Sequence, residues 1–355
     1  MVLPSAFDAA TWHAHEMIFG FAGAAVVGYA LTLIPNWTGR FPLQGWPLAV
    51  LAGLWVAGRM AVAGSAVLGA GIALLVDLAL PTIVLAAGVR EVVTGRNWRN
   101  LPVLGALGLL LAGNTLTHIE ALGLAATAGL GIRIGLATLL GLIALIGGRL
   151  LPSFTRNLLA RRGEPILPTP FGSVDRAALA LVIAALVVWS LAPDSIVTPP
   201  VALAAGLATL FRQSRWRPHR IGREPIIVAL HLGYAWLALG LVLLGTVRGA
   251  GGVSSSAAWH ALGAGAVGTM ILAVMCRTSL AHCGRAPVGG TGTATACLAL
   301  TLAAVMRVTA ELLPAFYLSL LFAAGAFWIV GFTLFVLIYA PILTTARPHA
   351  ARSTR

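Results

Sequence analysis

Apolar stretches as long as a membrane-spanning helix recur along almost the whole of this chain. Of its 355 residues, 59% are hydrophobic and 9% are charged, whereas a soluble domain carries about 25% charged residues. The sequence therefore predicts an all-α, polytopic transmembrane bundle, a single integral membrane domain over residues 1–355. Windows of about 20 residues place eleven spans near 15–35, 46–64, 66–89, 101–120, 124–150, 174–192, 196–211, 226–246, 257–276, 291–312 and 316–343.

The basic residues are distributed unevenly between the two sides of this bundle. All 23 are arginines, and the net charge of +13 would by itself fit nucleic-acid binding. The eleven spans instead gather most of them on one side, notably in connections near 152–173 and 212–225. Because short cytoplasmic loops retain positive charge, this asymmetry predicts an N-terminus outside and a cytoplasmic C-terminus. The expected partners of these arginines are membrane lipids with anionic head groups, and no nucleic acid.

Potential metal ligands stand at the start of the first span. His13, His15, Glu16 and Met17 occupy five consecutive positions, and imidazole, carboxylate and thioether groups can all coordinate copper or haem iron. The alternative is an interfacial cluster that only hydrogen-bonds neighbouring helices. On a regular helix His13 and Met17 share a face, whereas His13 and His15 diverge by about 200°. The two imidazoles bind one ion if the helix has not yet formed at His13, and otherwise serve two sites; both versions stay open.

Three further histidines lie in or beside the spans. His118 is at the outer end of the fourth span and His260 is near the outer start of the ninth. With the first pair, four histidines share one leaflet, and adjoining helices would let them form a bis-imidazole haem site, a copper site, or both. His231 sits about two turns inside the eighth span from the cytoplasmic side. A lone membrane histidine is, however, more often a satisfied hydrogen-bonding group than a ligand.

Two arginines inside spans are candidate partners for haem propionates. Arg133 lies in the fifth span, and Arg307 lies in the tenth, four residues before Glu311. The alternative for Arg307 is a local ion pair with Glu311, because residues four apart on a helix are neighbours.

Two other polar residues inside spans also require partners. Asp77, near the middle of the third span, must face the bundle interior, where it is protonated or paired with an arginine, and a proton relay through it is one reading. Asn114 precedes His118 by four residues and would orient that imidazole as a hydrogen-bond partner behind a metal ligand.

Five sequence blocks resemble the NnrS family, bacterial inner-membrane proteins that contain haem and copper and are linked to the response to nitric oxide. The blocks are WHAHEMIFGF at 12–21, PNWTGR at 35–40, GGRLLPSFTRN at 147–157, HLGYAW at 231–236 and AWHALGAGAVGTMILAVMCRTSLAHCGR at 258–285. The resemblance implies that His13, His15, His231 and His260 are the best ligand candidates, while His118 lies in a looser match. Family members have about twelve spans, with an apolar helix ahead of the WHAHEM block. Either a gene start placed too late or a member that lacks this helix would explain the difference.

The resemblance implies a role in resistance to nitric oxide and nitrosative stress, as in denitrification, without a defined reaction. Because the chain has no CxxCH motif, its haem would be non-covalent and b-type. The implied partners are nitric oxide or nitrosyl-metal species. Turnover would also need a quinol or protein electron donor, since no flavin, nicotinamide or iron–sulfur motif is present.

Two other classes of protein compete with this interpretation. A transporter of a small anion or metal ion would use Asp77, Arg133 and the histidines to line a polar path near the bilayer midplane. A structural subunit of a denitrification or respiratory complex would need neither cofactor nor transport.

Overall fold

The computed structural model describes residues 4–34, 43–247 and 254–345. Every regular element in these ranges is a helix, and ten of the described helices are long and apolar enough to cross a membrane. The predicted all-α polytopic class is therefore confirmed, and the protein is a multi-pass membrane protein. The PNWTGR block at 35–40 lies outside the described residues. Which side of the membrane each terminus faces stays a prediction from the arginines.

The chain divides into two compact units, Met1–Leu139 and Leu140–Arg355. The prediction of one membrane domain over residues 1–355 stays a prediction. The helix α7 (Ala128–Leu142) contains the boundary between them.

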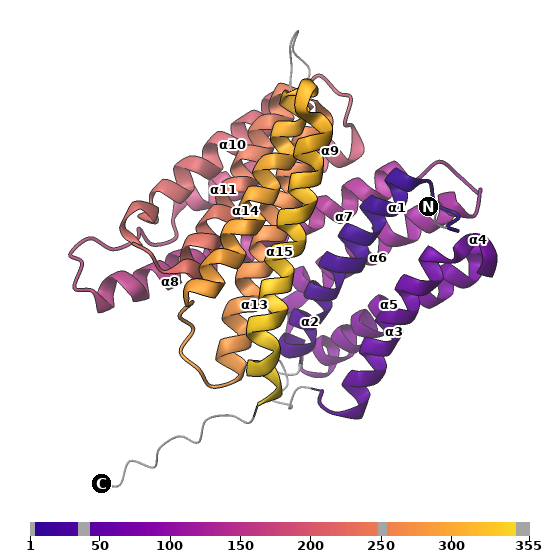
Figure 1. The fold of residues 1–355 in the computed structure, drawn as a ribbon, viewed down its shortest axis with the longest axis horizontal. Helices are drawn as coiled ribbons and strands as arrows, with labels where there is room; N and C mark the ends of the chain where they lie inside the picture. The colour runs from indigo at the N-terminus through magenta and orange to yellow at the C-terminus, as the bar shows by residue number, and fades with distance from the viewer. Residues whose placement is uncertain (1–3, 35–42, 248–253, 346–355) are drawn as a thin grey trace. The chain divides into compact units, whose positions relative to one another are not determined.

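Unit 1 carries the N-terminal histidines. Its first long helix is continuous but has a π-helical middle. The pairs α3–α5 and α5–α6 run side by side (Figure 1), and they enclose an apolar core that includes Leu80, Val84 and Leu104. Its elements before α7 are α1 (Ala9–His15), η1 (Glu16–Ala22), α2 (Gly23–Leu33), α3 (Trp46–Ala63), α4 (Ser65–Leu68), α5 (Ala70–Thr94), η3 (Trp98–Asn100) and α6 (Leu101–Ala121).

Unit 2 is organised around one central helix, α11, which packs against α10, α13 and α14, while α14 and α15 lie side by side (Figure 1). Most residues of α11 are buried, because other helices of unit 2 surround this helix. After α7 its elements are η4 (Ile143–Gly147), α8 (Gly148–Arg161), α9 (Ser173–Leu191), α10 (Thr198–Ser214), η5 (Pro218–Arg220), α11 (Pro225–Thr246), α12 (Ser255–His260), η6 (Ala261–Gly268), α13 (Thr269–His282), α14 (Thr291–Leu312), η7 (Pro314–Phe316) and α15 (Tyr317–Thr344).

Two of the predicted segments differ from the observed helices in kind as well as in their exact ends. The seventh span, 196–211, corresponds to α10, which has 17 residues and is not among the ten candidate spans. The predicted connection 152–173 is helical as far as Arg161. This helix is amphipathic, because Leu151, Thr155 and Leu159 recur every four residues and are buried. Hydropathy averaged over the whole segment is polar and does not reveal such a buried stripe.

Three π-helical segments interrupt the described helices: η1, η4 and η6. Such segments leave backbone carbonyls without regular helical partners and often mark functional sites. The buried Arg212 donates to the carbonyl oxygens of Ala144 in η4 and of Gly148 at the start of α8, at 3.1 and 3.3 Å. Pro152, four residues after Gly148, has no N–H to offer that second carbonyl. The Arg212 side chain also donates to Tyr234 and pairs with Asp175. One arginine thus joins four elements of unit 2.

Candidate metal centre

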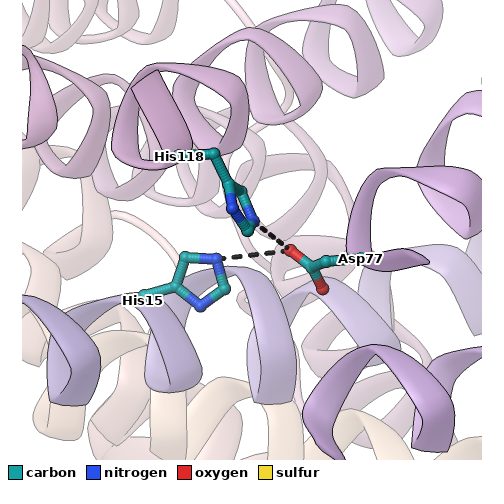
Figure 2. A group of neighbouring side chains, drawn as sticks. All are labelled: His15, Asp77 and His118. Atoms are coloured by element: carbon teal, nitrogen blue, oxygen red, sulfur yellow. Dashed lines mark hydrogen bonds and ion pairs between the residues drawn. The ribbon is translucent and has the colours of Figure 1, made fainter. Parts of the chain in front are cut away.

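Three buried side chains from three helices of unit 1 converge on one point (Figure 2). His15 ends α1, Asp77 lies in α5 and His118 lies in α6. The Asp77 Oδ2 atom is 3.3 Å from His15 Nε2 and 3.1 Å from His118 Nε2. Both imidazoles are fully buried and Asp77 is 5% exposed. This is the one group of three or more histidine, cysteine or acidic residues that could hold a metal ion among the described residues.

An amide from α6 completes the polar contacts. The Asn114 Nδ2 atom donates to Asp77 Oδ2 at 2.8 Å, and its Oδ1 atom lies 2.8 Å from His15 Nε2. Because Asn114 and His118 are four residues apart, they share one face of α6 and reach the same carboxylate. The predicted pairing of Asn114 with His118 therefore takes a different form: the two residues meet through Asp77.

The charges around this group do not cancel. Arg59 on α3 donates to Glu16 Oε1 at 2.6 Å and also to Asp77 Oδ1. With neutral imidazoles and ionised carboxylates, two carboxylates face one guanidinium, which leaves one formal negative charge. The Asp77 side chain is buried, whereas those of Arg59 and Glu16 are 16% and 19% exposed. An uncompensated charge in partly buried surroundings is costly, and a bound metal ion would balance it.

The hydrogen bonds of the two imidazoles also fit a cation. His15 Nδ1 lies 3.1 Å from Glu16 Oε1; a proton on Nδ1 leaves the Nε2 lone pair directed at the oxygen atoms of Asp77 and Asn114. A metal-ligating histidine typically donates its other ring proton to a carboxylate in this way. His118 Nδ1 is buried and has no hydrogen-bond partner. Donor separations near 3.1 and 3.3 Å match those of ligands that share an ion at about 2.0–2.2 Å.

Two glycines permit the charged side chains to approach. A Cβ atom on Gly20 would lie 2.5 Å from Arg59 Nη1, and one on Gly58 would lie 3.1 Å from Asp77 Oδ1 and 3.3 Å from the Asp77 Cα. Larger residues at these positions would displace Arg59 or separate α3 from α5. The small residues thus allow the close helix packing that brings Arg59 to the carboxylates.

Aromatic rings enclose the imidazoles. The Phe7 ring centroid lies 5.1 Å from that of His15 and 5.3 Å from that of His118, and Phe19 lies 5.5 Å from His15. These rings exclude water, and a low local dielectric strengthens the electrostatic interactions of the group.

The structure separates the two N-terminal histidines. Asp8 caps α1 by accepting hydrogen bonds from the backbone N–H groups of Ala10 and Thr11, so the helix is already formed at His13. His13 is exposed, whereas His15 is buried. The hypothesis that both imidazoles bind one ion required that the helix be unformed at His13, and the structure does not meet that condition. Met17 lies beyond them in η1 and is partly buried.

The predicted ligand His231 has partners within unit 2. Its Nε2 atom lies 2.9 Å from Thr155 Oγ1, and its Nδ1 atom lies 3.4 Å from the amide nitrogen of Gln213. That amide also donates to the His231 carbonyl at 2.7 Å. The arrangement matches the satisfied hydrogen-bonding group that a membrane histidine more often is.

His260 and Arg307 come together through Ser256. The His260 Nδ1 atom is 2.8 Å from the Ser256 carbonyl, and Arg307 Nη2 donates to Ser256 Oγ at 3.2 Å. Arg307 also forms the predicted local pair with Glu311, at 2.7 Å. The other candidate arginine, Arg133, lies partly buried on α7.

Sequence reasoning placed Asp77 in the bundle interior and offered an arginine as its partner, and the structure confirms this pairing. It did not identify that arginine as Arg59, nor join Asp77 to His15. The available signal was Arg59 itself, because a charged side chain within an apolar span needs a buried partner.

The substitution Glu16→Gln is expected to weaken metal binding at this group about 10- to 100-fold, because it replaces the charged carboxylate that orients His15 with a neutral amide. Isothermal titration of purified protein with copper(II) would measure the change. Asp8→Asn is the matched control: it removes a carboxylate from the same helix but keeps a good capping residue. Equal affinities for Glu16→Gln and the wild type would show that Glu16 does not support the metal site.

The helices and the buried group define a multi-pass membrane protein with a histidine–carboxylate site that could bind a metal ion. A family model described as NnrS protein matches residues 1–347, and the chain belongs to the NnrS family. No curated protein and no solved structure matches the chain.

Proposed function

We propose that this protein is a copper- and haem-binding protein of the bacterial inner membrane that acts in the response and resistance to nitric oxide and nitrosative stress. The observation that carries the proposal is the convergence of His15, Asp77 and His118 at a buried point with a formal negative charge. Membership of the NnrS family supports the connection with nitric oxide.

Copper fits this donor set for two reasons. Imidazole suits copper, and copper(II) stands at the top of the affinity order for divalent first-row metals at nitrogen and oxygen sites. Three protein ligands would leave a coordination position open, and a bound copper ion would offer that position to nitric oxide. The chain's own residues hold the ligands in place: Glu16 orients His15, while Arg59 and Asn114 fix the Asp77 carboxylate.

Haem does not fit between His15 and His118. The two ring centroids are 5.4 Å apart at an interplanar angle of 90°, and the Asp77 carboxylate contacts both imidazoles, which leaves no room for a porphyrin plane. The haem ligand is therefore sought elsewhere, and His260 is the better candidate in unit 2. The Ser256 carbonyl accepts a hydrogen bond from its Nδ1, as a backbone carbonyl or carboxylate typically does for the second ring nitrogen of a metal-ligating histidine, whereas His231 is buried and held by Thr155 and Gln213.

The test is an optical spectrum with copper and haem quantitation of detergent-purified protein that was expressed with both cofactors in supply. We expect copper in the wild type, and a Soret band that His260→Ala removes and His231→Ala retains. A Soret band lost only in His231→Ala would instead assign His231 as the haem ligand. Wild-type protein that contains neither cofactor would contradict the proposal and favour a transporter, which proteoliposome uptake would then reveal.

A further inference from the structure

A small cavity lies beside the candidate metal centre within unit 1. Its volume is about 40 Å³. Arg59, Asp77 and Asn114 line its polar end, and the rest of its wall is apolar and comes from α2, α3, α5, α6 and η1. Wall residues include Phe19, Gly23, Ala24, Trp55, Leu80 and Leu107. The cavity therefore connects an apolar helix interface with the carboxylate shared by both buried imidazoles.

The size and the lining of this cavity select its occupant. A volume of roughly 10–15 Å³ already admits one water molecule, but a buried water needs two to four polar partners. Arg59 and Asn114 both donate to Asp77 at the polar end of the cavity. The buried Arg59 Nε atom has no hydrogen-bond partner among the residues that the structure describes, but one donor is fewer than the partners that a buried water needs. An uncharged diatomic molecule fits the space and needs no such partners, whereas an ion would lose its hydration against an apolar wall.

We propose that this cavity admits nitric oxide from the lipid phase and holds it next to the His15–Asp77–His118 site. Nitric oxide is small, uncharged and soluble in lipid, and Val26, Val27, Leu54 and Trp55 of the cavity wall are only partly buried. The inference rests on the proposed function, because it gives the copper site its route of access. The wall residues of α2 then control how fast nitric oxide reaches the metal.

Two glycines of α2 make a matched test. Gly23 lines the cavity, and a Cβ atom there would meet only the Ile18 carbonyl oxygen, at 3.6 Å. A larger side chain at Gly23 thus has space to grow toward the cavity without striking the backbone. Gly28, on the same helix, is exposed, and a Cβ atom there would meet nothing within 4 Å. Leucine at either position raises helix propensity equally, but only Gly23→Leu fills the cavity.

The experiment mixes copper(II)-loaded protein in lipid nanodiscs with nitric oxide without oxygen, and follows the copper(II) EPR signal by rapid freeze-quench. Nitric oxide bound to the ion pairs its odd electron with that of copper(II), so the signal falls with no added reductant. We expect Gly23→Leu to slow this loss roughly tenfold, equivalent to about 1.4 kcal/mol in the barrier. Copper stoichiometry should stay unchanged, and Gly28→Leu should react like the wild type.

The possible outcomes separate this inference from the proposed function. Gly23→Leu that holds copper and reacts at the wild-type rate would overturn the access route while leaving the copper site intact. Equal slowing in Gly28→Leu would also overturn it, because that position does not face the cavity. Wild-type protein that binds no copper would overturn the proposed function and the role of the cavity with it. If Gly23→Leu fails to fold, Ala24→Leu at the same wall replaces it.

Discussion

Alanine at His118 or at His15 is expected to weaken metal binding by more than about 100-fold, since loss of a residue that merely supports a ligand costs 10- to 100-fold. Each substitution removes one of only three donor groups from a fully buried site. The expected effect is large because, in the described part of the chain, the group that could hold an ion consists of these two histidines and Asp77 alone. Titration of purified protein with copper(II), followed by EPR, would measure both the affinity and the ligand nitrogen couplings.

His13→Ala is the matched control for this prediction. His13 lies on the same helix as His15 but is exposed, so its loss should leave the affinity within about twofold, as expected for a surface change away from the site. Circular dichroism and gel filtration would confirm that all variants remain folded. A result in which His13→Ala loses copper and His15→Ala keeps it would exclude the three-residue site.

Methionine at Arg212 is expected to destabilise unit 2 by about 3–5 kcal/mol, because it breaks a buried ion pair and leaves Asp175 without its main counter-charge. Arg212 is 1% exposed, and its Nε atom lies 3.0 Å from Asp175 Oδ1. The substitution also removes the donors to the carbonyl oxygens of Ala144 in η4 and Gly148 in α8. Thermal unfolding in detergent, followed by tryptophan fluorescence, would show the loss, since Trp216 lies against this guanidinium.

Arg215→Met provides the comparison for Arg212. Arg215 pairs with the same carboxylate at 3.0 Å, but its side chain is 19% exposed. A partly solvated ion pair is worth about 0–1 kcal/mol, so this variant should unfold close to the wild-type temperature. Equal and small losses in both variants would show that burial of Arg212 contributes nothing to the stability of unit 2.

Hydropathy predicted the helices well and their ends less well. The predicted span 291–312 coincides with α14, and 46–64 differs from α3 by one residue. The first helix begins at Ala9, six residues before the predicted start, because Asp8 caps a polar first turn that an apolar window does not detect. Hydropathy measures transfer into lipid, whereas a helix terminus depends on local hydrogen bonds.

The candidate site was only partly predictable for a different reason. The sequence placed His15 and His118 in one leaflet together with His13 and His260, but it singled out Asp77 separately and considered one shared ion only for His15 and its neighbour His13. Close spacing along the chain is an incomplete guide here, because the other polar partners of His15, apart from the adjacent Glu16, lie on α5 and α6. Pairing between helices depends on packing at small residues such as Gly58, and no periodicity within a single span specifies which helix will be its neighbour.

The π-helical segment η1 lies between His15 and the cavity wall formed by α2. A π-turn accommodates an additional residue within an otherwise regular helix, and each residue advances an α-helix by about 100°. Deleting one residue from 16–22 would let the α-helix close up, and would rotate Gly23 and the rest of α2 by about that angle relative to His15. Single substitutions would not reveal this dependence, because they leave the number of residues in the segment unchanged. Insertions and deletions in the first helix are therefore expected to be far less tolerated than its abundant small apolar residues suggest.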